Sequence, residues 1–148
     1  MSGGDYMDHI VYLDHKSDEL NALITGEKDI ILRGATGRKL PYNRVKKSDV
    51  LYFCVNDGSG TIYGKGLVKE VFFSEKLTKE ESMEMIDNHL ERIKLSGKAL
   101  SRFYGKRYLS FVFLESFSVL PSFQFDKTAF GNMDDWLLVE DINRVKIV

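Results

Sequence analysis

Two basic residues close together in the sequence have side chains that could act on one anionic or carbonyl-bearing ligand. Lys28 and Arg33 lie five residues apart within the segment Gly26–Arg33. A lysine becomes an acid–base group when burial lowers its pKa, and both side chains donate charge-assisted hydrogen bonds to phosphate or carbonyl oxygens. Because strand side chains alternate between faces, the two can share a pocket only if Lys28 belongs to a turn before the strand.

A short helix and a strand should position this pair. Residues 18–25 carry apolar side chains at helical spacing. Gly26 follows as a helix stop, since glycine enters the left-handed backbone region without a Cβ clash. Residues 30–32 form a β-prone apolar run. The sequence therefore predicts a helix, a turn that holds Lys28, and a strand that holds Arg33.

The spacing G-x-K-x-x-x-x-R over Gly26–Arg33, after a short helix and before a strand, resembles the ASCH family of the PUA-like superfamily, to which EVE and YTH-type domains are related. Residues 44–53 resemble the family's turn into its next strand, with Ser48 where a glycine is usual. Residues 64–71 resemble the strand after it. The resemblance covers residues 9–75 well and the remainder in element order.

The resemblance implies a small, partly open β-barrel with helices packed at its side or mouth, and a ligand-binding cleft between barrel and helices. The residues themselves predict a mixed α+β fold with a largely antiparallel sheet, because strands outnumber helices. We therefore expect an α+β, PUA-like β-pseudobarrel. Residues 1–8 are expected to be a flexible N-terminus and residues 9–148 a single PUA-like, ASCH-type domain, since 148 residues can bury one core.

Local patterns predict the other elements. The turn-forming segment at residues 56–60 predicts a hairpin. Thr78–Glu81 has the spacing of a capping box that starts a longer helix, and residues 98–104 can form a shorter one. Strands are expected at residues 9–13, 49–55, 61–73, 108–120, 136–139 and 144–148.

Composition limits the classes of function. The net charge is −1, so the whole surface is not that of a generic polyanion binder. The single Cys54 cannot form an internal disulfide and no apolar run approaches the length of a membrane span, so we expect a cytoplasmic protein without a membrane partner. His9, His15 and His89 are too scattered for a metal site, and we predict no metal and no cofactor. The oligomeric state stays open.

Basic residues are concentrated in two stretches. Residues 38–47 hold five positive charges and no negative one. In the second stretch, positive side chains recur every four residues from Lys94 to Lys106 and would form a stripe along a continuous helix. Aromatic residues interleave with both stretches, as in surfaces that stack unpaired bases. The alternative is an ordinary solvated surface.

We therefore predict a cleft that binds RNA or a nucleotide-like ligand. Lys28 and Arg33 would lie in it, the basic stretches would border it, and serines of the strand at residues 108–120 would hydrogen-bond at its floor. Trp136, the sole tryptophan, is favoured as a core anchor and is also a candidate base contact. The candidate ligand-binding residues are Lys28, Arg33, Arg38, Lys39, Arg44, Lys47, Lys98, Arg102, Lys106, Ser116, Ser118 and Trp136.

A hydrolase is the first alternative. Some proteins similar to ASCH domains hydrolyse a modified cytidine or cleave RNA, and the amidohydrolase members use a lysine, a threonine three residues later and a distant glutamate. Lys28 matches the lysine, Glu70 is the nearest candidate for the glutamate, and Ile31 stands at the threonine position. Isoleucine offers no nucleophile, so we expect a binding protein rather than an enzyme. For Lys28 and Glu70 the alternative is a plain surface ion pair.

A protein-interaction module is the second alternative. It would present an exposed apolar patch and no positive groove. The phenylalanines that could form such a patch are Phe72, Phe73, Phe123 and Phe125. The exposure of these four side chains therefore separates an interaction module from a protein that binds its ligand in a basic cleft.

Overall fold

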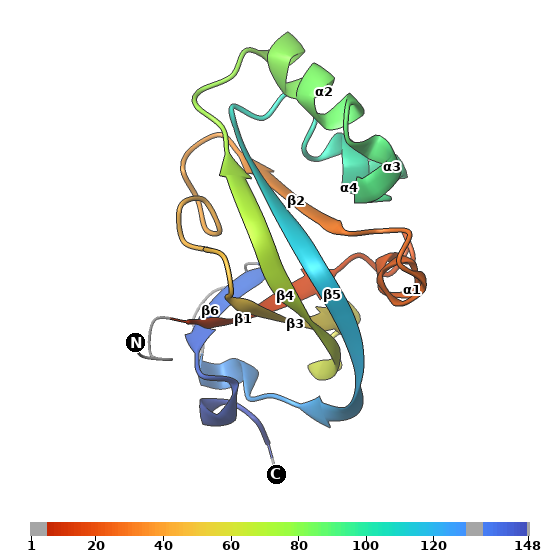
Figure 1. Ribbon diagram of the computed structural model, residues 1–148, viewed down its shortest axis with the longest axis vertical. Helices are drawn as coiled ribbons and strands as arrows, with labels where there is room; N and C mark the ends of the chain where they lie inside the picture. The colour runs from red at the N-terminus through yellow and green to blue at the C-terminus, as the bar shows by residue number, and fades with distance from the viewer. Residues whose placement is uncertain (1–5, 130–134, 148) are drawn as a thin grey trace.

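One curled sheet forms the framework of the protein. The computed structural model describes residues 6–129 and 135–147. Within them, six strands pair in the order β2-β5-β4-β3-β1-β6 (Figure 1). The strands are β1 (Asp8–Leu13), β2 (Ile30–Ala35), β3 (Val50–Val55), β4 (Thr61–Phe73), β5 (Tyr108–Gln124) and β6 (Trp136–Glu140).

Short helices pack beside this sheet. Figure 1 shows α2, α3 and α4 gathered at one end of the long β4–β5 pair, whereas α1 lies near β2 at the side of the sheet. The α-helices of the described residues are α1 (Glu19–Thr25), α2 (Lys79–Asp87), α3 (Leu90–Ile93) and α4 (Gly97–Ser101). Two 3₁₀ helices, η2 (Lys127–Ala129) and η3 (Ile142–Arg144), lie on either side of β6 in the chain.

The long strands β4 and β5 carry the curvature of the sheet. They pair antiparallel along most of their length, with register shifts on both sides of Val68. Such bulges bend a strand and increase its twist. β1 and β3 run parallel, and the other pairings among the described strands are antiparallel. The predicted α+β fold with a largely antiparallel sheet is confirmed, and the sheet forms a half-barrel (Figure 1).

The predicted capping box is present, but the long helix that it starts is broken. The Thr78 hydroxyl accepts a hydrogen bond from the Glu81 N–H at 3.1 Å, and the Glu81 carboxylate accepts one from the Thr78 N–H at 2.8 Å. The helix that this box starts, α2, ends at Asp87, before either residue of left-handed backbone. Lys94, with φ 52°, then ends α3, since the left-handed region stops a helix, and Gly97, with φ 57°, begins α4. The basic stripe expected along one helix is therefore wrong: Lys94 caps α3, Lys98 and Arg102 belong to α4 and its cap, and Lys106 lies beyond α4.

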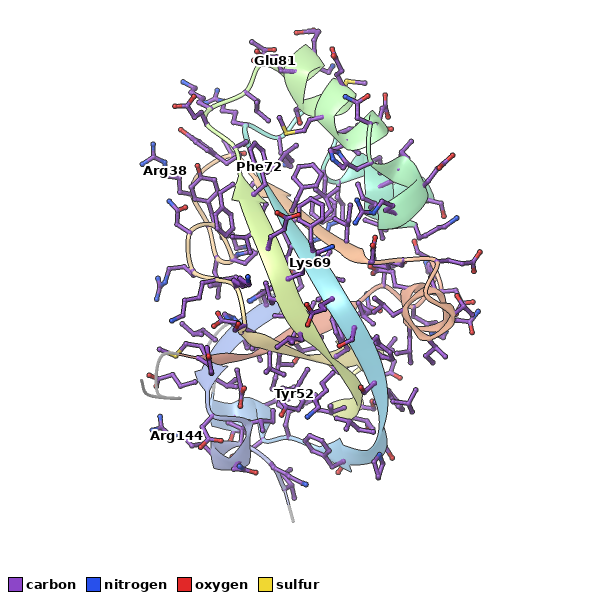
Figure 2. All side chains as sticks on the ribbon, in the orientation of Figure 1. Arg38, Tyr52, Lys69, Phe72, Glu81 and Arg144 are labelled. Carbon is purple, nitrogen blue, oxygen red and sulfur yellow. The ribbon has the colours of Figure 1, made fainter. Side chains whose placement is uncertain are left out.

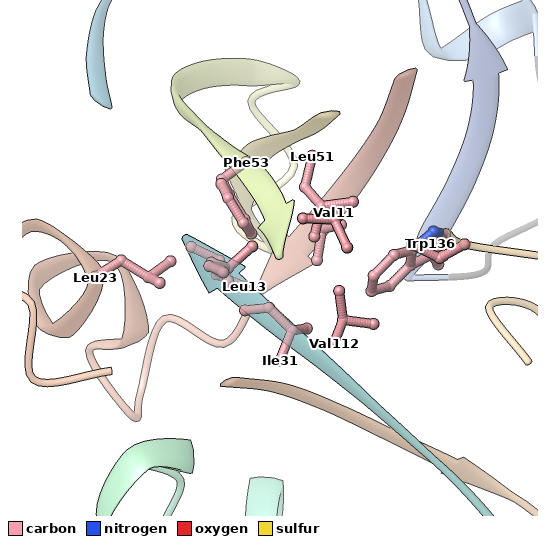
Figure 3. Close-up of a cluster of buried hydrophobic side chains, with 11 residues drawn as sticks. Val11, Leu13, Leu23, Ile31, Leu51, Phe53, Val112 and Trp136 are labelled. Atoms are coloured by element: carbon pink, nitrogen blue, oxygen red, sulfur yellow. The ribbon is translucent and has the colours of Figure 1, made fainter. Parts of the chain in front are cut away.

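The core of the half-barrel is apolar and fully enclosed. Its side chains come from all six strands, from α1 and from Val45 in the connection before β3. Figure 3 shows these side chains pointing toward one another inside the curled sheet. Ile31 is among them and is completely buried, as is Trp136. A second cluster packs α2, α3 and α4 against the sheet, and a third fills the end that carries η3. The helices are thus held mainly by apolar burial, as short helices must be.

The chain ends differ from the prediction. Asp8 already belongs to β1, and the N–H of Met7 donates to the Asp49 carboxylate at 3.1 Å. The expected flexible N-terminus otherwise falls on residues 1–5, which lie outside the described residues. The strand expected at residues 144–148 is wrong: η3 occupies its start, and Lys146 forms only an isolated bridge. No helix within residues 6–129 and 135–147 is long and apolar enough to cross a membrane.

Candidate functional site

Lys28 lies in the turn between α1 and β2, as predicted, and is enclosed by protein. Its N–H donates to the Ala22 carbonyl at 3.0 Å, which holds the turn against α1. Its ammonium group donates to the Ile93 carbonyl and lies 3.2 Å from Glu19 Oε1. Burial lowers the pKa of Lys28, and the Glu19 carboxylate opposes that change. Lys28 is therefore part of a buried ion pair, not a solvent-exposed base.

The carboxylate partner of Lys28 is Glu19, and the sequence analysis missed it. Glu19 is buried in the first turn of α1, where its Oε2 accepts a hydrogen bond from the Asp14 N–H at 2.6 Å. Glu70, the predicted partner, is exposed on β4 beside α2, so that prediction is wrong. The available signal was the spacing of Glu19 and buried Leu23, which places both on one face of the helix.

Arg33 lies on β2 with only 6% of its surface exposed, and most of its donors are used by the protein. Its two terminal nitrogens donate to the Leu32 carbonyl at 2.8 Å and the Tyr12 carbonyl at 2.7 Å. Its Nε has no hydrogen bond among the described residues and lies 3.3 Å from Asp135 Oδ2. The guanidinium also stacks over the ring of Trp136 at 5.7 Å. The Nε of this buried, permanently charged group is thus ion-paired with Asp135 without a hydrogen bond.

Asp135 occupies the space that this donor faces. Its Oδ2 lies 3.3 Å from Arg33 Nε and 3.1 Å from Arg102 Nη2. Burial alone would raise the pKa of Asp135, but the positive charges of Arg33 and Arg102, with Lys39 contributing, lower it. Asp135 is therefore an ionised carboxylate among cationic groups, and it holds the position that an anionic ligand group would take.

Two small cavities adjoin this ionic cluster. One has a volume of about 50 Å³ and the other about 30 Å³, which is room for a few atoms or a water molecule in each. They share four lining residues, Arg33, Arg102, Phe103 and Asp135, and we call this region the Arg33 cleft. The first cavity is also lined by Gly34, Ala35, Gly37, Lys39, Leu40, Pro41, Tyr42, Tyr108 and Ser110.

Comparison with known proteins shows a similarity of fold. Neither a protein-family model nor a curated protein matches the sequence. The crystal structure of ASCH from Zymomonas mobilis aligns with a TM-score of 0.62 and 11% identity, over 90% of this chain and 87% of that one. A serine-to-alanine mutant of that protein aligns with a TM-score of 0.63 and 12% identity, over 95% and 93%. This chain has the ASCH-type fold.

The ASCH-type fold confirms the PUA-like pseudobarrel that the resemblance implied. It brings together groups that are distant in the sequence: Arg33 from β2, Arg102 from the end of α4 and Asp135 from the residue before β6. Asp135 gave no signal in the sequence, because its role depends on contacts across 33 residues or more. These groups form a small polar region centred on Arg33.

The predicted basic rim is only partly at this cleft. Lys39 lines the larger cavity, and Arg38 lies over the Tyr108 ring at 5.4 Å. Figure 2 shows Arg38 at the edge of the molecule. Arg44 and Lys47 are exposed on the same connection but line neither cavity. Lys98 is exposed and Lys106 is half-buried, and neither lines either cavity. Of the basic residues proposed for the rim and stripe, Arg102 and Lys39 are the ones placed at the Arg33 cleft.

The serine at the cleft is Ser110. It is buried, pairs with Arg33 across β2 and β5, and lines the larger cavity. Ser116 and Ser118 are exposed farther along β5; Ser116 is six residues away, or about 20 Å of strand. Their prediction as residues of the cleft floor is therefore wrong, because β5 is 17 residues long and only its first part borders the Arg33 cleft. Ser110 differs from Ser116 and Ser118 because it is buried. The alternation of residues along the strand does not indicate which of its serines is buried.

Trp136 has the packing role that the sequence favoured. It has no exposed surface, and its indole N–H donates to His9 Nδ1 at 3.0 Å. This bond makes Nδ1 an acceptor, so the His9 proton is on Nε2, which donates to Asp49 at 2.8 Å. Burial lowers the pKa of His9 although Asp49 opposes it. Trp136 therefore contacts the cleft only through Arg33 and has no free edge for a base.

The four phenylalanines considered for an apolar patch do not form one. Phe125 is buried in the cluster at the η3 end, and Phe123 is half-buried beside it. Phe73 is half-buried and packs against Tyr42, with 5.4 Å between the ring centroids. Phe72 alone among the four is exposed, with 46% of its surface accessible. A continuous patch at these positions is therefore excluded.

Proposed function

We propose that the chain binds RNA or a nucleotide-like ligand, with a phosphate or carbonyl oxygen of the ligand bound at the Arg33 cleft. The observation that carries the proposal is the buried guanidinium of Arg33, whose Nε lacks a hydrogen bond and faces an ionised Asp135. Arginine matches the planar, two-oxygen geometry of phosphate and carboxylate groups. A ligand anion would displace Asp135 and bind to Arg33 and Arg102 together.

Aromatic side chains beside the cleft support a ligand that contains a base. The rings of Tyr42 and Tyr108 lie 5.5 Å apart in an edge-to-face contact, and both line the larger cavity. Both side chains are partly exposed, so a base could stack on them while its phosphate lies at Arg33. The cavities hold only one small chemical group, so most of the ligand would lie outside them on the surface.

Exposed arginines offer a matched pair of variants that test the proposal. Arg102 and Arg144 are both exposed, and each forms one 3.1 Å ion pair with a carboxylate, Asp135 and Glu140 respectively. Short single-stranded RNA, duplex RNA and modified nucleosides would be titrated at two salt concentrations. We expect Arg102→Gln to weaken RNA binding roughly ten-fold and to reduce the salt dependence by about one ion, and Arg144→Gln to match the wild type.

A second pair of variants tests the displacement of Asp135. Asp135→Asn removes the negative charge that competes with the ligand, so we expect its affinity for RNA to rise; Glu140→Gln is the control. The proposal fails if Arg102→Gln and Asp135→Asn both bind every RNA and nucleoside as the wild type does. Circular dichroism of each variant establishes that it is folded. Hydrolysis of the RNA and of the nucleosides is measured in the same samples. We expect none, because the ammonium group of Lys28 is buried and cannot reach a ligand.

A further inference from the structure

A second and much larger concavity lies on the helix-bearing side of the sheet. It has a volume of about 730 Å³, within the range of small-molecule sites. We call it the α2 groove, because α2 forms one wall and the ends of β4 and β5 form the floor. Its lining residues are Glu70, Val71, Phe72, Leu77, Glu81, Glu84, Met85, Asn88, His89, Phe111 and Phe113.

The floor of the α2 groove is aromatic and open to solvent. Phe72 lies opposite Phe111 across β4 and β5, and 46% of its surface is exposed. Figure 2 shows Phe72 near the end of β4 that lies toward α2. The ring of His89 packs on Phe111 at 5.0 Å and is oriented by a 2.9 Å hydrogen bond from its Nδ1 to the Met85 carbonyl. A large exposed phenylalanine at the bottom of a concave surface is a site where an apolar ligand gains by burial.

The rim of the groove is acidic. Glu70, Glu81 and Glu84 line it, and no lysine or arginine is among its lining residues in the described part of the chain. Glu81 is occupied by the capping box, but the carboxylates of Glu70 and Glu84 have no hydrogen bond or close ion pair with any described residue. The neighbouring Arg92 donates two 2.8 Å hydrogen bonds to Asp29, lies over the ring of Phe113 at 5.4 Å and interacts electrostatically with Glu70. Of these two carboxylates, Glu84 is thus the one with no cation near it among the described residues. The groove therefore combines an apolar floor with two rim carboxylates that no described residue engages by a hydrogen bond or close ion pair.

We propose that the α2 groove binds an organic ammonium ion, a small molecule with an aromatic or aliphatic body and a protonated amine. The body would pack on Phe72 and Phe111, and the amine would lie near Glu84 with Glu70 on the facing strand. Aromatic faces attract a nearby cation, and a carboxylate pair adds a charge-assisted hydrogen bond. The rim carboxylates would repel an anionic ligand, so the charge of the groove favours a cationic one.

The α2 groove is separate from the Arg33 cleft. Phe111 and Phe113 lie on the face of β5 opposite to Ser110, because successive strand side chains alternate. The two sites also differ in charge, with cations around the cleft and carboxylates around the groove. The inference is therefore independent of the proposed RNA binding, and each can fail without the other.

Three probes with the same body and different head groups test the charge selection. They are 4-phenylbutylammonium, 4-phenylbutanol and 4-phenylbutanoate, titrated into the protein while the Met85 methyl resonance is followed by NMR. A Met85→Leu variant assigns that resonance. We expect saturable shifts, with the ammonium probe bound several-fold more tightly than the alcohol and the carboxylate bound most weakly.

Exposed glutamates on and off the groove supply matched variants. Glu84→Gln and Glu70→Gln keep the shape of the rim and remove its charge, so each should lower the affinity for the ammonium probe roughly two- to five-fold without changing that for the alcohol. Glu80→Gln is the control, because Glu80 is exposed on α2 but does not line the groove. Phe72→Ala should weaken all three probes.

Three outcomes would overturn the proposal. Equal affinities for the three probes, or no saturable shift with any of them, would exclude selection of an ammonium ion. The same affinity of Glu70→Gln and Glu84→Gln as of wild type would show that the carboxylates take no part. Binding of a basic amphipathic peptide to the groove, without binding of the ammonium probe, would make this face a protein-docking surface instead.

Discussion

The buried pair of Lys28 and Glu19 permits a sharp test of the electrostatics inside this fold. Both side chains are about 2% exposed, and their charged atoms lie 3.2 Å apart. Lys28→Met retains most of the side-chain volume but leaves the Glu19 carboxylate buried without a counter-charge. Removing one partner of a buried ion pair costs about 3–5 kcal/mol, and for a chain of this size that lowers Tm by roughly 10 °C.

The double variant separates loss of charge from loss of packing. Lys28→Met with Glu19→Gln buries no charge, and a glutamine carbonyl can still accept the hydrogen bond from the Asp14 N–H. The Ile93 carbonyl loses the ammonium as its donor, so a loss of about 1–2 kcal/mol remains. We therefore expect the double variant to be more stable than Lys28→Met alone, with a coupling energy of at least about 2 kcal/mol once the loss in Glu19→Gln is included.

Urea denaturation followed by circular dichroism at pH 7 measures all four members of this cycle. The free energies of unfolding come from linear extrapolation, and equal m-values show that each variant unfolds from the same compact state. If the double variant is no more stable than Lys28→Met, or the coupling energy is below about 0.5 kcal/mol, the two groups do not interact as charges. The account of Lys28 as half of a buried ion pair would then be wrong.

Two further predictions concern stability. The pKa of His9 is lowered by burial, so below about pH 6.5 the unfolded chain binds a proton that the folded protein does not. The free energy of unfolding should therefore fall as the pH drops from 7.5 to 5.5, measured from urea midpoints. Separately, a Cβ at Gly64 would lie 2.8 Å from the Ser118 carbonyl oxygen, so Gly64→Ala should destabilise the protein by about 1–3 kcal/mol in thermal unfolding.

Each of these predictions has a control within the same chain. The pH dependence between 7.5 and 5.5 should be much reduced in His9→Gln and retained in His15→Gln, because His15 is exposed. An equal slope in wild type and His9→Gln would contradict the assignment to His9. Gly37→Ala adds a methyl group where no atom lies within 4 Å, so its unfolding should match the wild type; a similar loss in both glycine variants would refute the steric argument.

The local part of the site was predictable because short-range chemistry determines it. Gly26 ends α1 at φ 82°, which places Lys28 in the turn and Arg33 on the strand, as the residue spacing indicated. The capping box at Thr78 is another local pattern that the structure reproduces. In both cases the residues that decide the conformation lie within one or two turns of each other in the sequence.

The partners of those residues could not be predicted in the same way. Periodicity indicates which face a residue occupies, but it does not report which distant element covers that face. Asp135 lies beside Arg33 because the strand that follows it, β6, pairs with β1. Glu70 lies on β4 at the α2 groove, away from Lys28. The basic stripe failed because the helix after Thr78 already ends at Asp87 and α3 ends at Lys94, and lysine in the left-handed region is not apparent from its residue type.

The position of the single tryptophan makes the protein its own optical reporter. Trp136 is the sole indole in the chain, is fully buried, and joins β6 to β1 through the His9 ring. Its fluorescence should therefore register separation of β6 from β1, which are neighbours at one edge of the sheet, without any attached dye. Because Arg33 lies over the same ring at 5.7 Å, movement of that guanidinium toward a bound anion would alter the emission as well. Unfolding and occupancy of the cleft could thus be read from one intrinsic signal.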